Sequence, residues 1–174
     1  MARKQAGASG GTPAVLALVR AGVDFVVRDY EHDPRATSYG LEAATALGVA
    51  PERVLKTLVA TVDDDLVVAV VPSSSHLDLK ALARLRGGRR AAMADPAVAQ
   101  RATGYVVGGI SPLGQRRPLP TVVDETALGH ATVLVSGGRR GLDVELAPAD
   151  LVRLTAAVTG AVGRADGVGR LSRS

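Results

Sequence analysis

A chain of 174 residues is long enough for one domain with a buried core, and its 47% hydrophobic and 22% charged residues are typical of a globular protein. The absence of cysteine excludes disulfides, zinc–thiolate sites, iron–sulfur clusters and a cysteine nucleophile. The net charge of +4 favours an anionic partner, and one Phe and three Tyr are too few for a base-stacking surface, so a nucleic acid would be held by its phosphates. No apolar segment approaches the roughly 20 residues of a membrane helix, and we expect a cytoplasmic protein without membrane contact.

Both ends of the chain have the composition of tails. Residues 1–11 are basic and then rich in Gly and Ser, and in residues 160–174 Gly, Arg and Ser replace the apolar periodicity. We therefore expect disordered tails at 1–11 and 160–174, and one folded domain at 12–159. Neither a repeat nor a linker-like change of composition divides that domain.

Five helices are predicted, four of them from residues that cap helix N-termini. Thr, Ser and Asp accept hydrogen bonds from the first N–H groups of a helix, Pro fits the first turn, and Gly ends many helices. On this pattern the predicted helices are 12–22, 37–48, 78–87, one that begins at 95–96, and 148–158, where apolar residues recur at helical spacing.

Seven β-rich runs lie between these helices and predict strands. They are residues 25–30, 55–62, 66–71, 105–107, 121–123, 131–135 and 142–146. The connections at 63–65 and 137–141 are too short for a helical crossover, so both predict antiparallel hairpins. Antiparallel pairs interrupted by single helices favour an α+β fold over a doubly wound parallel sheet.

The glycine-rich segment 108–114 is a candidate binding loop. It lacks the Lys–Ser/Thr pair of a phosphate-binding P-loop and the second glycine of a nucleophile elbow, so Ser111 is a poor nucleophile. Its glycines would let backbone N–H groups approach a ligand and stabilise an oxyanion, although an ordinary loop is the commoner origin of such a segment.

The charged and histidine side chains give few independent signals. The three histidines lie in separate segments, which does not support a preformed metal site, and Glu31–His32–Asp33 is typical of a surface turn. Lys56 lies at the start of a predicted strand on its more apolar face, where a snorkelling side chain and a functional lysine are equally good explanations. Strand periodicity places Asp143 and Glu145 toward solvent.

Seven stretches of sequence, taken together, resemble one family. They are residues 12–14, 30–33, 55–58, 77–80, 93–96, 103–115 and 136–146. In this order they resemble the YbaK family of cysteinyl-tRNA(Pro) deacylases, which is similar to the editing domain inserted in bacterial prolyl-tRNA synthetases. The resemblance spans residues 12–154 and implies a mixed, largely antiparallel and strongly curved, barrel-like sheet wrapped by helices.

The resemblance also implies site residues. Lys56 matches the essential lysine of the family, and Gly108, Gly109 and Ile110 match the catalytic loop over the scissile ester. The implied substrate-binding residues are Tyr30, Tyr39, Thr57, Ser111, Ser136 and Asp143. Three Arg pairs occur at 89–90, 116–117 and 139–140, and we expect tRNA phosphates to contact Arg116, Arg117, Arg139 and Arg140. Tyr39 stands where Phe is common in the family, which affects fine substrate choice.

The implied activity is trans-editing, the hydrolysis of the ester of misacylated Cys-tRNA(Pro). In this family the substrate thiol is thought to attack its own ester carbonyl, so the protein needs no nucleophile, metal or cofactor. Two alternatives stay open: a deacylase for another small residue such as Ala-tRNA(Pro), and a non-catalytic module that binds tRNA or a synthetase. The expected partner is misacylated tRNA(Pro), with prolyl-tRNA synthetase as a further candidate, and a monomer is favoured.

Overall fold

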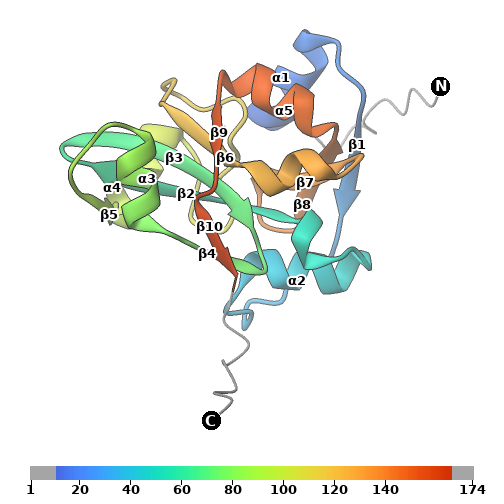
Figure 1. Cartoon of the computed structure of the whole chain (residues 1–174). Helices are drawn as coiled ribbons and strands as arrows, with labels where there is room; N and C mark the ends of the chain where they lie inside the picture. The colour runs from blue at the N-terminus through green and yellow to red at the C-terminus, as the bar shows by residue number, and fades with distance from the viewer. Residues whose placement is uncertain (1–10, 166–174) are drawn as a thin grey trace.

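The computed structural model describes residues 11–165, which form ten strands, five α-helices and two short 3₁₀ helices (Figure 1). Among these residues, no helix has the length and hydrophobicity needed to span a membrane. The elements in chain order are α1 (Pro13–Ala21), β1 (Phe25–Asp29), α2 (Tyr39–Leu47), η1 (Pro51–Arg53), β2 (Leu55–Val62), β3 (Asp65–Pro72), β4 (Ser75–Leu77), α3 (Leu79–Leu85), β5 (Ala91–Met93), α4 (Pro96–Thr103), β6 (Thr121–Asp124), η2 (Glu125–Gly129), β7 (Val133–Arg139), β8 (Leu142–Leu146), α5 (Pro148–Thr155), β9 (Val158–Gly160) and β10 (Gly163–Ala165).

The helix caps expected from the sequence are present. The side chains of Thr12, Ser38, Asp78 and Asp95 each accept a hydrogen bond from a backbone N–H in the first turn of the following helix. Helices α1, α2 and α4 end at glycines in the left-handed conformation, in which a side chain is strained. Local capping chemistry therefore determines where these helices begin and end.

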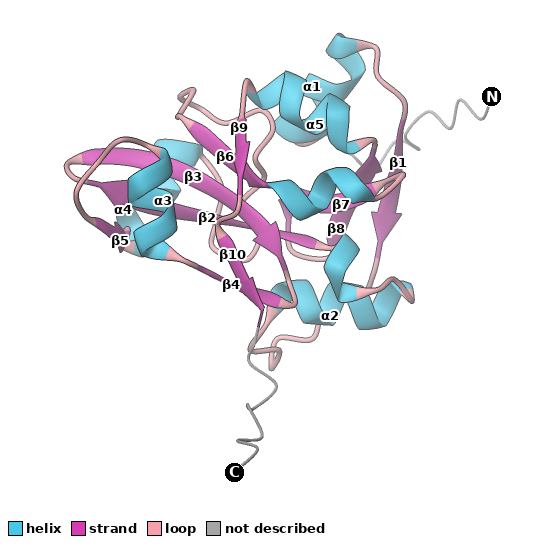
Figure 2. Cartoon of the chain, viewed as in Figure 1, coloured by secondary structure: helices cyan, strands magenta, loops and turns pink. Residues whose placement is uncertain are grey.

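The strands form three open sheets (Figure 2). One is antiparallel with the order β1–β8–β7, the second is mixed with the order β5–β2–β3–β6–β9, and the third is the pair β10–β4. Both predicted hairpins, β2–β3 and β7–β8, are confirmed. The α+β class is confirmed as well, but the sheets do not close into a barrel, and a single parallel bridge between Val54 and Leu134 connects the two larger ones.

The two larger sheets pack against each other and each is covered on its outer face. Val59 and Val70 from one sheet and Val135 and Val144 from the other lie in the same buried cluster. On the outer face of the five-stranded sheet, α3 packs through buried Leu82. On the outer face of the three-stranded sheet, α2 packs on the ends of the strands through small alanine side chains (Figure 1). Because α2 lies there, that face is not the solvent-exposed surface that strand periodicity predicts.

Three expectations from the sequence are wrong in detail. Residues 105–107 form a bend that leads into a turn rather than a strand, because the buried Tyr105 side chain points into the core and its hydroxyl donates to the Leu113 carbonyl at 2.7 Å. The last helix ends at Thr155, since Ala156 adopts the left-handed conformation. The folded part continues past 159 through β9 and β10, with Val162 fully buried between them. The remainder of the expected tails, 1–10 and 166–174, lies outside the described residues.

Candidate active site

A cavity of about 390 Å³ lies where the two larger sheets meet. Its wall comes from the start of β2, the N-terminus of α2, the segment from β5 into α4, the loop after α4, and the β7–β8 hairpin. Most of the lining side chains are apolar or small, so the volume suits a compact group. The lining residues are Tyr30, Thr37, Ser38, Tyr39, Gly40, Ala43, Val54, Leu55, Lys56, Thr57, Leu58, Val59, Met93, Ala94, Pro96, Ala99, Val107, Gly108, Ile110, Ser136 and Asp143.

The first residues of β2 supply two polar groups to this cavity. Lys56 and Thr57 are both half-buried and both line it. The Thr57 hydroxyl is buried and has no hydrogen-bond partner within residues 11–165. A buried hydroxyl without a partner costs about 1–3 kcal/mol, so its retention at a cavity wall points to a ligand that completes the bond.

Asp143 lies at the opposite wall and is only 6% exposed. In the sheet it stands between Arg28 of β1 and Ser136 of β7. Burial raises the pKa of the Asp143 carboxyl to about 7. Burial and, second, the charge of Asp143 raise the pKa of Tyr30 to about 12. Periodicity is therefore wrong about Asp143, which is buried and lines the cavity.

Glu145, two residues along the same strand, has a different environment. Its carboxylate accepts hydrogen bonds from Arg28 at 2.5 Å, Thr132 at 2.7 Å and Arg53 at 3.1 Å. Burial alone raises its pKa, but these hydrogen bonds and the two guanidinium charges outweigh that effect and lower it. Glu145 thus joins β1, η1 and β8 as an ionised structural group, while Asp143 faces the cavity.

The Asp143→Asn variant is expected to be more stable than the wild type above pH 7, by roughly 2 to 4 kcal/mol. The pKa of Asp143 is about 7 in the folded protein against an ordinary 3.8, so the native state holds this proton more tightly. Stability therefore falls as pH rises from about 4 to about 7. Urea unfolding of both proteins from pH 4.5 to 8 measures the difference, and parallel curves for the two proteins would contradict the assignment.

The glycine loop contributes two backbone N–H groups. Gly108 and Ile110 line the cavity, and no hydrogen bond of either N–H is recorded within residues 11–165. Gly109 does not line it, and its N–H donates to the Val106 carbonyl at 2.9 Å. Of the three expected loop positions, Gly108 and Ile110 therefore stay candidates for an oxyanion site, and Gly109 does not.

Ser111 is not brought to the cavity. It is completely buried, and its hydroxyl accepts a hydrogen bond from the Leu113 N–H at 3.2 Å. Its carbonyl accepts from the Gln115 side chain at 2.9 Å. The expected contact of Ser111 with substrate is not supported. Its hydrogen bonds instead join residues of segment 111–115 to one another.

Tyr39, the first residue of α2, forms one side of the cavity mouth. Its ring lies 5.8 Å from the His32 ring, centroid to centroid, and 5.2 Å from the Arg140 guanidinium carbon. His32 is held by the Glu42 carboxylate at 2.7 Å. His32 therefore supports the Tyr39 ring from the segment before α2. Residues 11–165 contain no group of three or more side chains that could hold a metal ion.

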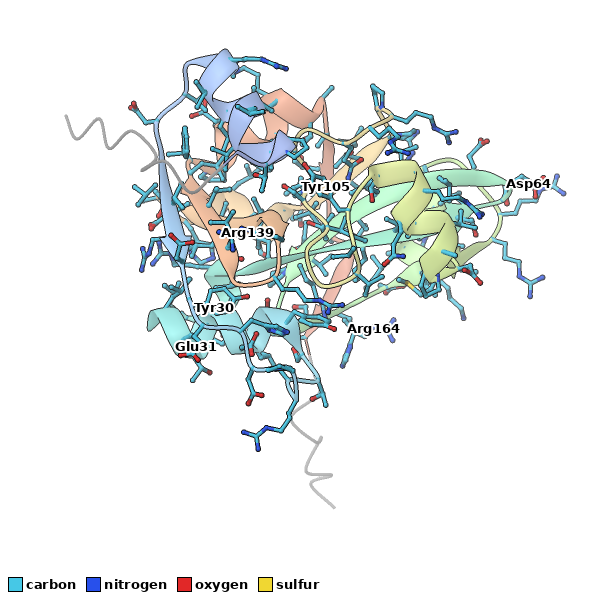
Figure 3. The ribbon with its side chains drawn as sticks, turned by 180° about the vertical axis from the view of Figure 1, so that it is seen from behind. Tyr30, Glu31, Asp64, Tyr105, Arg139 and Arg164 are labelled. Atoms are coloured by element: carbon cyan, nitrogen blue, oxygen red, sulfur yellow. The ribbon has the colours of Figure 1, made fainter. Side chains whose placement is uncertain are left out.

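The four arginines expected to bind tRNA fall into two places. Arg139 and Arg140 lie in the β7–β8 hairpin beside the cavity mouth, where Arg139 forms an exposed 3.6 Å ion pair with Asp29. Arg117 lines a second hollow of about 370 Å³ at the other end of β2. Val62, beside that hollow, lies six strand positions after Lys56, a distance of roughly 20 Å. Figure 3 shows Arg139 at one side of the molecule and Asp64, in the β2–β3 turn, at the far end.

Sequence reasoning did not assign one wall of the cavity. Met93, Ala94, Pro96 and Ala99 come from β5 and the start of α4. The Asp95 cap fixes the start of α4, and residues 93–96 carry part of the family resemblance. Neither observation predicts that these residues line a cavity. Their apolar side chains have no chemistry that a motif could flag, and only the tertiary fold shows that they face the cavity.

The model of the aminoacyl-tRNA editing domain matches residues 32–154. The chain belongs to this family. The chain is 40% identical over 114 residues, 64% of its length and 69% of the relative's, to an Enterococcus faecalis protein named as a Cys-tRNA(Pro)/Cys-tRNA(Cys) deacylase, EbsC.

Two further relatives cover more of the chain. It is 27% identical over 141 residues, 80% of this chain and 84% of the other, to the Escherichia coli K12 multifunctional Ser/Thr-tRNA deacylase ProXp-y. A solved structure described as a trans-editing enzyme for prolyl-tRNA synthetase superposes with a TM-score of 0.76 at 28% identity, over 92% of this chain and 99% of that one. The family match, the named relatives and the solved structure therefore all indicate an aminoacyl-tRNA deacylase with the editing-domain fold.

Proposed function

We propose that this editing domain acts in trans to remove cysteine from misacylated Cys-tRNA(Pro). The observation that carries the proposal is the cavity, which gathers free backbone donors, Lys56 and an unpartnered hydroxyl inside a small, mostly apolar wall. The relative named as a Cys-tRNA(Pro)/Cys-tRNA(Cys) deacylase supports the acyl group. The test is whether the purified protein releases cysteine from Cys-tRNA(Pro) while leaving cognate Pro-tRNA(Pro) intact.

The proposed mechanism uses the substrate's own nucleophile. Within the described chain, no histidine lines the cavity, and His32, which packs against the Tyr39 ring, is hydrogen-bonded to Glu42. In the proposed step the cysteine thiolate attacks its own ester carbonyl carbon, and the bond to the ribose oxygen breaks. The ribose oxygen takes up a proton and leaves with the tRNA, and water opens the resulting thiolactone to free cysteine.

In this mechanism the protein contributes position and charge stabilisation. Near-attack geometry of an intramolecular nucleophile supplies several kcal/mol. The N–H groups of Gly108 and Ile110 would receive the developing oxyanion, a contribution of about 3 kcal/mol. The Lys56 ammonium would neutralise the phosphate or hold a hydroxyl of the terminal adenosine. Asp143, Tyr30 and Ser136 would contact the aminoacyl group from the opposite wall.

A second candidate is a deacylase that prefers Ser-tRNA. The unpartnered Thr57 hydroxyl favours it, because a substrate hydroxyl would complete that hydrogen bond. The Escherichia coli relative named as a Ser/Thr-tRNA deacylase is compatible with this preference. The alanine, valine and methionine side chains of the wall favour the less polar thiol, and on this balance cysteine is the stronger candidate.

We also propose that tRNA is held mainly through its phosphates, by Arg139 and Arg140 at the cavity mouth and by Arg116 and Arg117 on the loop that precedes β6. Arg116, Arg117, Arg139 and Arg140 are all exposed.

The proposed form is a monomer in the cytoplasm that corrects errors of prolyl-tRNA synthetase. The identity of the tRNA would then be read chiefly by that synthetase as partner.

The affinity for uncharged tRNA is expected to fall on the order of 20- to 150-fold between 50 and 200 mM salt. Three or four phosphate contacts give that slope, because each contact releases condensed counterions. Filter binding with tRNA(Pro) and a tRNA of different identity measures it, and we expect similar affinities for both. Tight binding at high salt, with strong preference for one tRNA, would argue against phosphate contacts as the main source of affinity.

A further inference from the structure

Arg140 spans the gap between the β7–β8 hairpin and the glycine loop. Its Nε and Nη2 atoms both donate to the Val107 carbonyl oxygen, at 3.0 and 2.7 Å. Its guanidinium carbon lies 5.2 Å from the centre of the Tyr39 ring, within cation–π range. One side chain therefore links three walls of the cavity: the hairpin, the loop and the first residue of α2.

The loop is packed against these groups closely enough to exclude a side chain. A Cβ on Gly108 would lie 2.8 Å from two atoms of the Tyr39 ring and 2.9 Å from the Arg140 Nε, and its φ of +87° disfavours other residues. A Cβ on Gly109 would lie 2.8 Å from the Arg139 Cα. The position of the loop is thus set by direct contact with the hairpin and with Tyr39.

The carbonyl that Arg140 binds belongs to the same peptide unit as the Gly108 N–H. In a trans peptide the C=O and N–H point in opposite directions, and the chain contains no cis peptide in residues 11–165. Holding the Val107 oxygen therefore fixes the direction of the Gly108 N–H. Two charged donors on the carbonyl also polarise the amide and strengthen its N–H as a donor.

We propose that Arg140 is a positioning residue for catalysis, which aims the Gly108 N–H at the developing oxyanion. This inference rests on the proposed deacylase function. It separates Arg140 from its neighbour: Arg139 is exposed and forms an ion pair with Asp29, so its contribution is to tRNA affinity, whereas Arg140 also acts on the rate of the chemical step.

The test is Arg140→Lys, which keeps the charge for phosphates but has neither the planar two-donor fork nor a stacking surface. Under single-turnover conditions at saturating enzyme, we expect a 10- to 100-fold lower rate, with tRNA affinity changed less than threefold. Arg139→Ala is expected to show the reverse, weaker binding and a smaller change in the saturated rate. Arg153→Lys, on the exposed face of α5, is the matched control and retains both values.

A second readout does not depend on activity. Amide hydrogen exchange of the segment 105–110 is expected to be faster in Arg140→Lys than in the wild type, with unchanged thermal unfolding. A wild-type saturated rate in Arg140→Lys, a loss that lies entirely in tRNA affinity, or unchanged exchange would overturn the proposal. An inactive wild type would instead overturn the deacylase function, and the exchange measurement would still decide whether Arg140 holds the loop.

Discussion

Lys56→Ala is expected to lower the single-turnover rate of Cys-tRNA(Pro) deacylation by on the order of 100-fold or more, while the fold is kept. Lys56 lines the cavity from the start of β2, next to Thr57 with its unpartnered hydroxyl. In the proposed mechanism the Lys56 ammonium holds the terminal adenosine, and a substrate displaced from its near-attack position by about 1 Å loses on the order of 100-fold in rate. The loss is therefore expected mainly in the saturated rate.

The matched control is Lys80→Ala, since Lys80 is exposed on α3 and does not line the cavity. Circular dichroism and thermal unfolding check that both variants fold. A Lys56→Ala rate equal to that of the wild type would leave Lys56 as a side chain that merely extends to solvent from the strand end.

Ser-tRNA(Pro) is expected to be deacylated at least about 100-fold more slowly than Cys-tRNA(Pro), because the two substrates nearly match in shape but differ in nucleophile. A thiol with a pKa near 8.5 is partly ionised at neutral pH, and a serine hydroxyl is not. The comparison separates chemistry from fit. Single-turnover rates with equal amounts of each charged tRNA provide the measurement.

Two further observations belong to the same prediction. Ser136→Ala removes the acceptor of the Gly138 N–H, and we expect a rate loss equivalent to about 1–3 kcal/mol through lost positioning. Neither the wild type nor this variant should form a covalent acyl-enzyme, and a thiolactone should be trapped as a transient product. An acyl-enzyme seen by mass spectrometry would indicate a nucleophile of the protein, and equal rates for the two substrates would indicate hydrolysis by an enzyme-held water; either result would contradict thiol-assisted cleavage.

Features that depend on neighbouring residues could be predicted from the sequence. The caps at Thr12, Ser38, Asp78 and Asp95 act within one helical turn, and both hairpins follow from connections too short to cross a sheet. The three-residue strands β4, β5, β9 and β10 were not predicted, because pairing with distant strands, rather than local propensity, holds them. The same distant pairing extends the fold past residue 159.

The candidate site shows the same division. Periodicity placed Lys56 on the face that Leu58 and Ala60 share, but it gave Asp143 to solvent because it did not include α2 on the second face of the sheet. The glycine spacing of 108–114 indicated a loop, but only the fold shows that the Gly109 N–H is already bonded and that Ser111 is buried behind it. Arg140 was grouped with Arg139 as a surface charge, and its bonds to Val107 distinguish the two.

The most direct test is a deacylation panel with purified protein and tRNA(Pro) charged with Cys, Ala, Ser or Pro. We predict fastest release from Cys-tRNA(Pro), slower release from the Ala and Ser forms, and no release from Pro-tRNA(Pro) above the spontaneous rate. Release from none of the four would contradict an aminoacyl-tRNA deacylase and favour a binding module. Faster release of Ala or Ser than of Cys would retain the deacylase and contradict cysteine as its substrate.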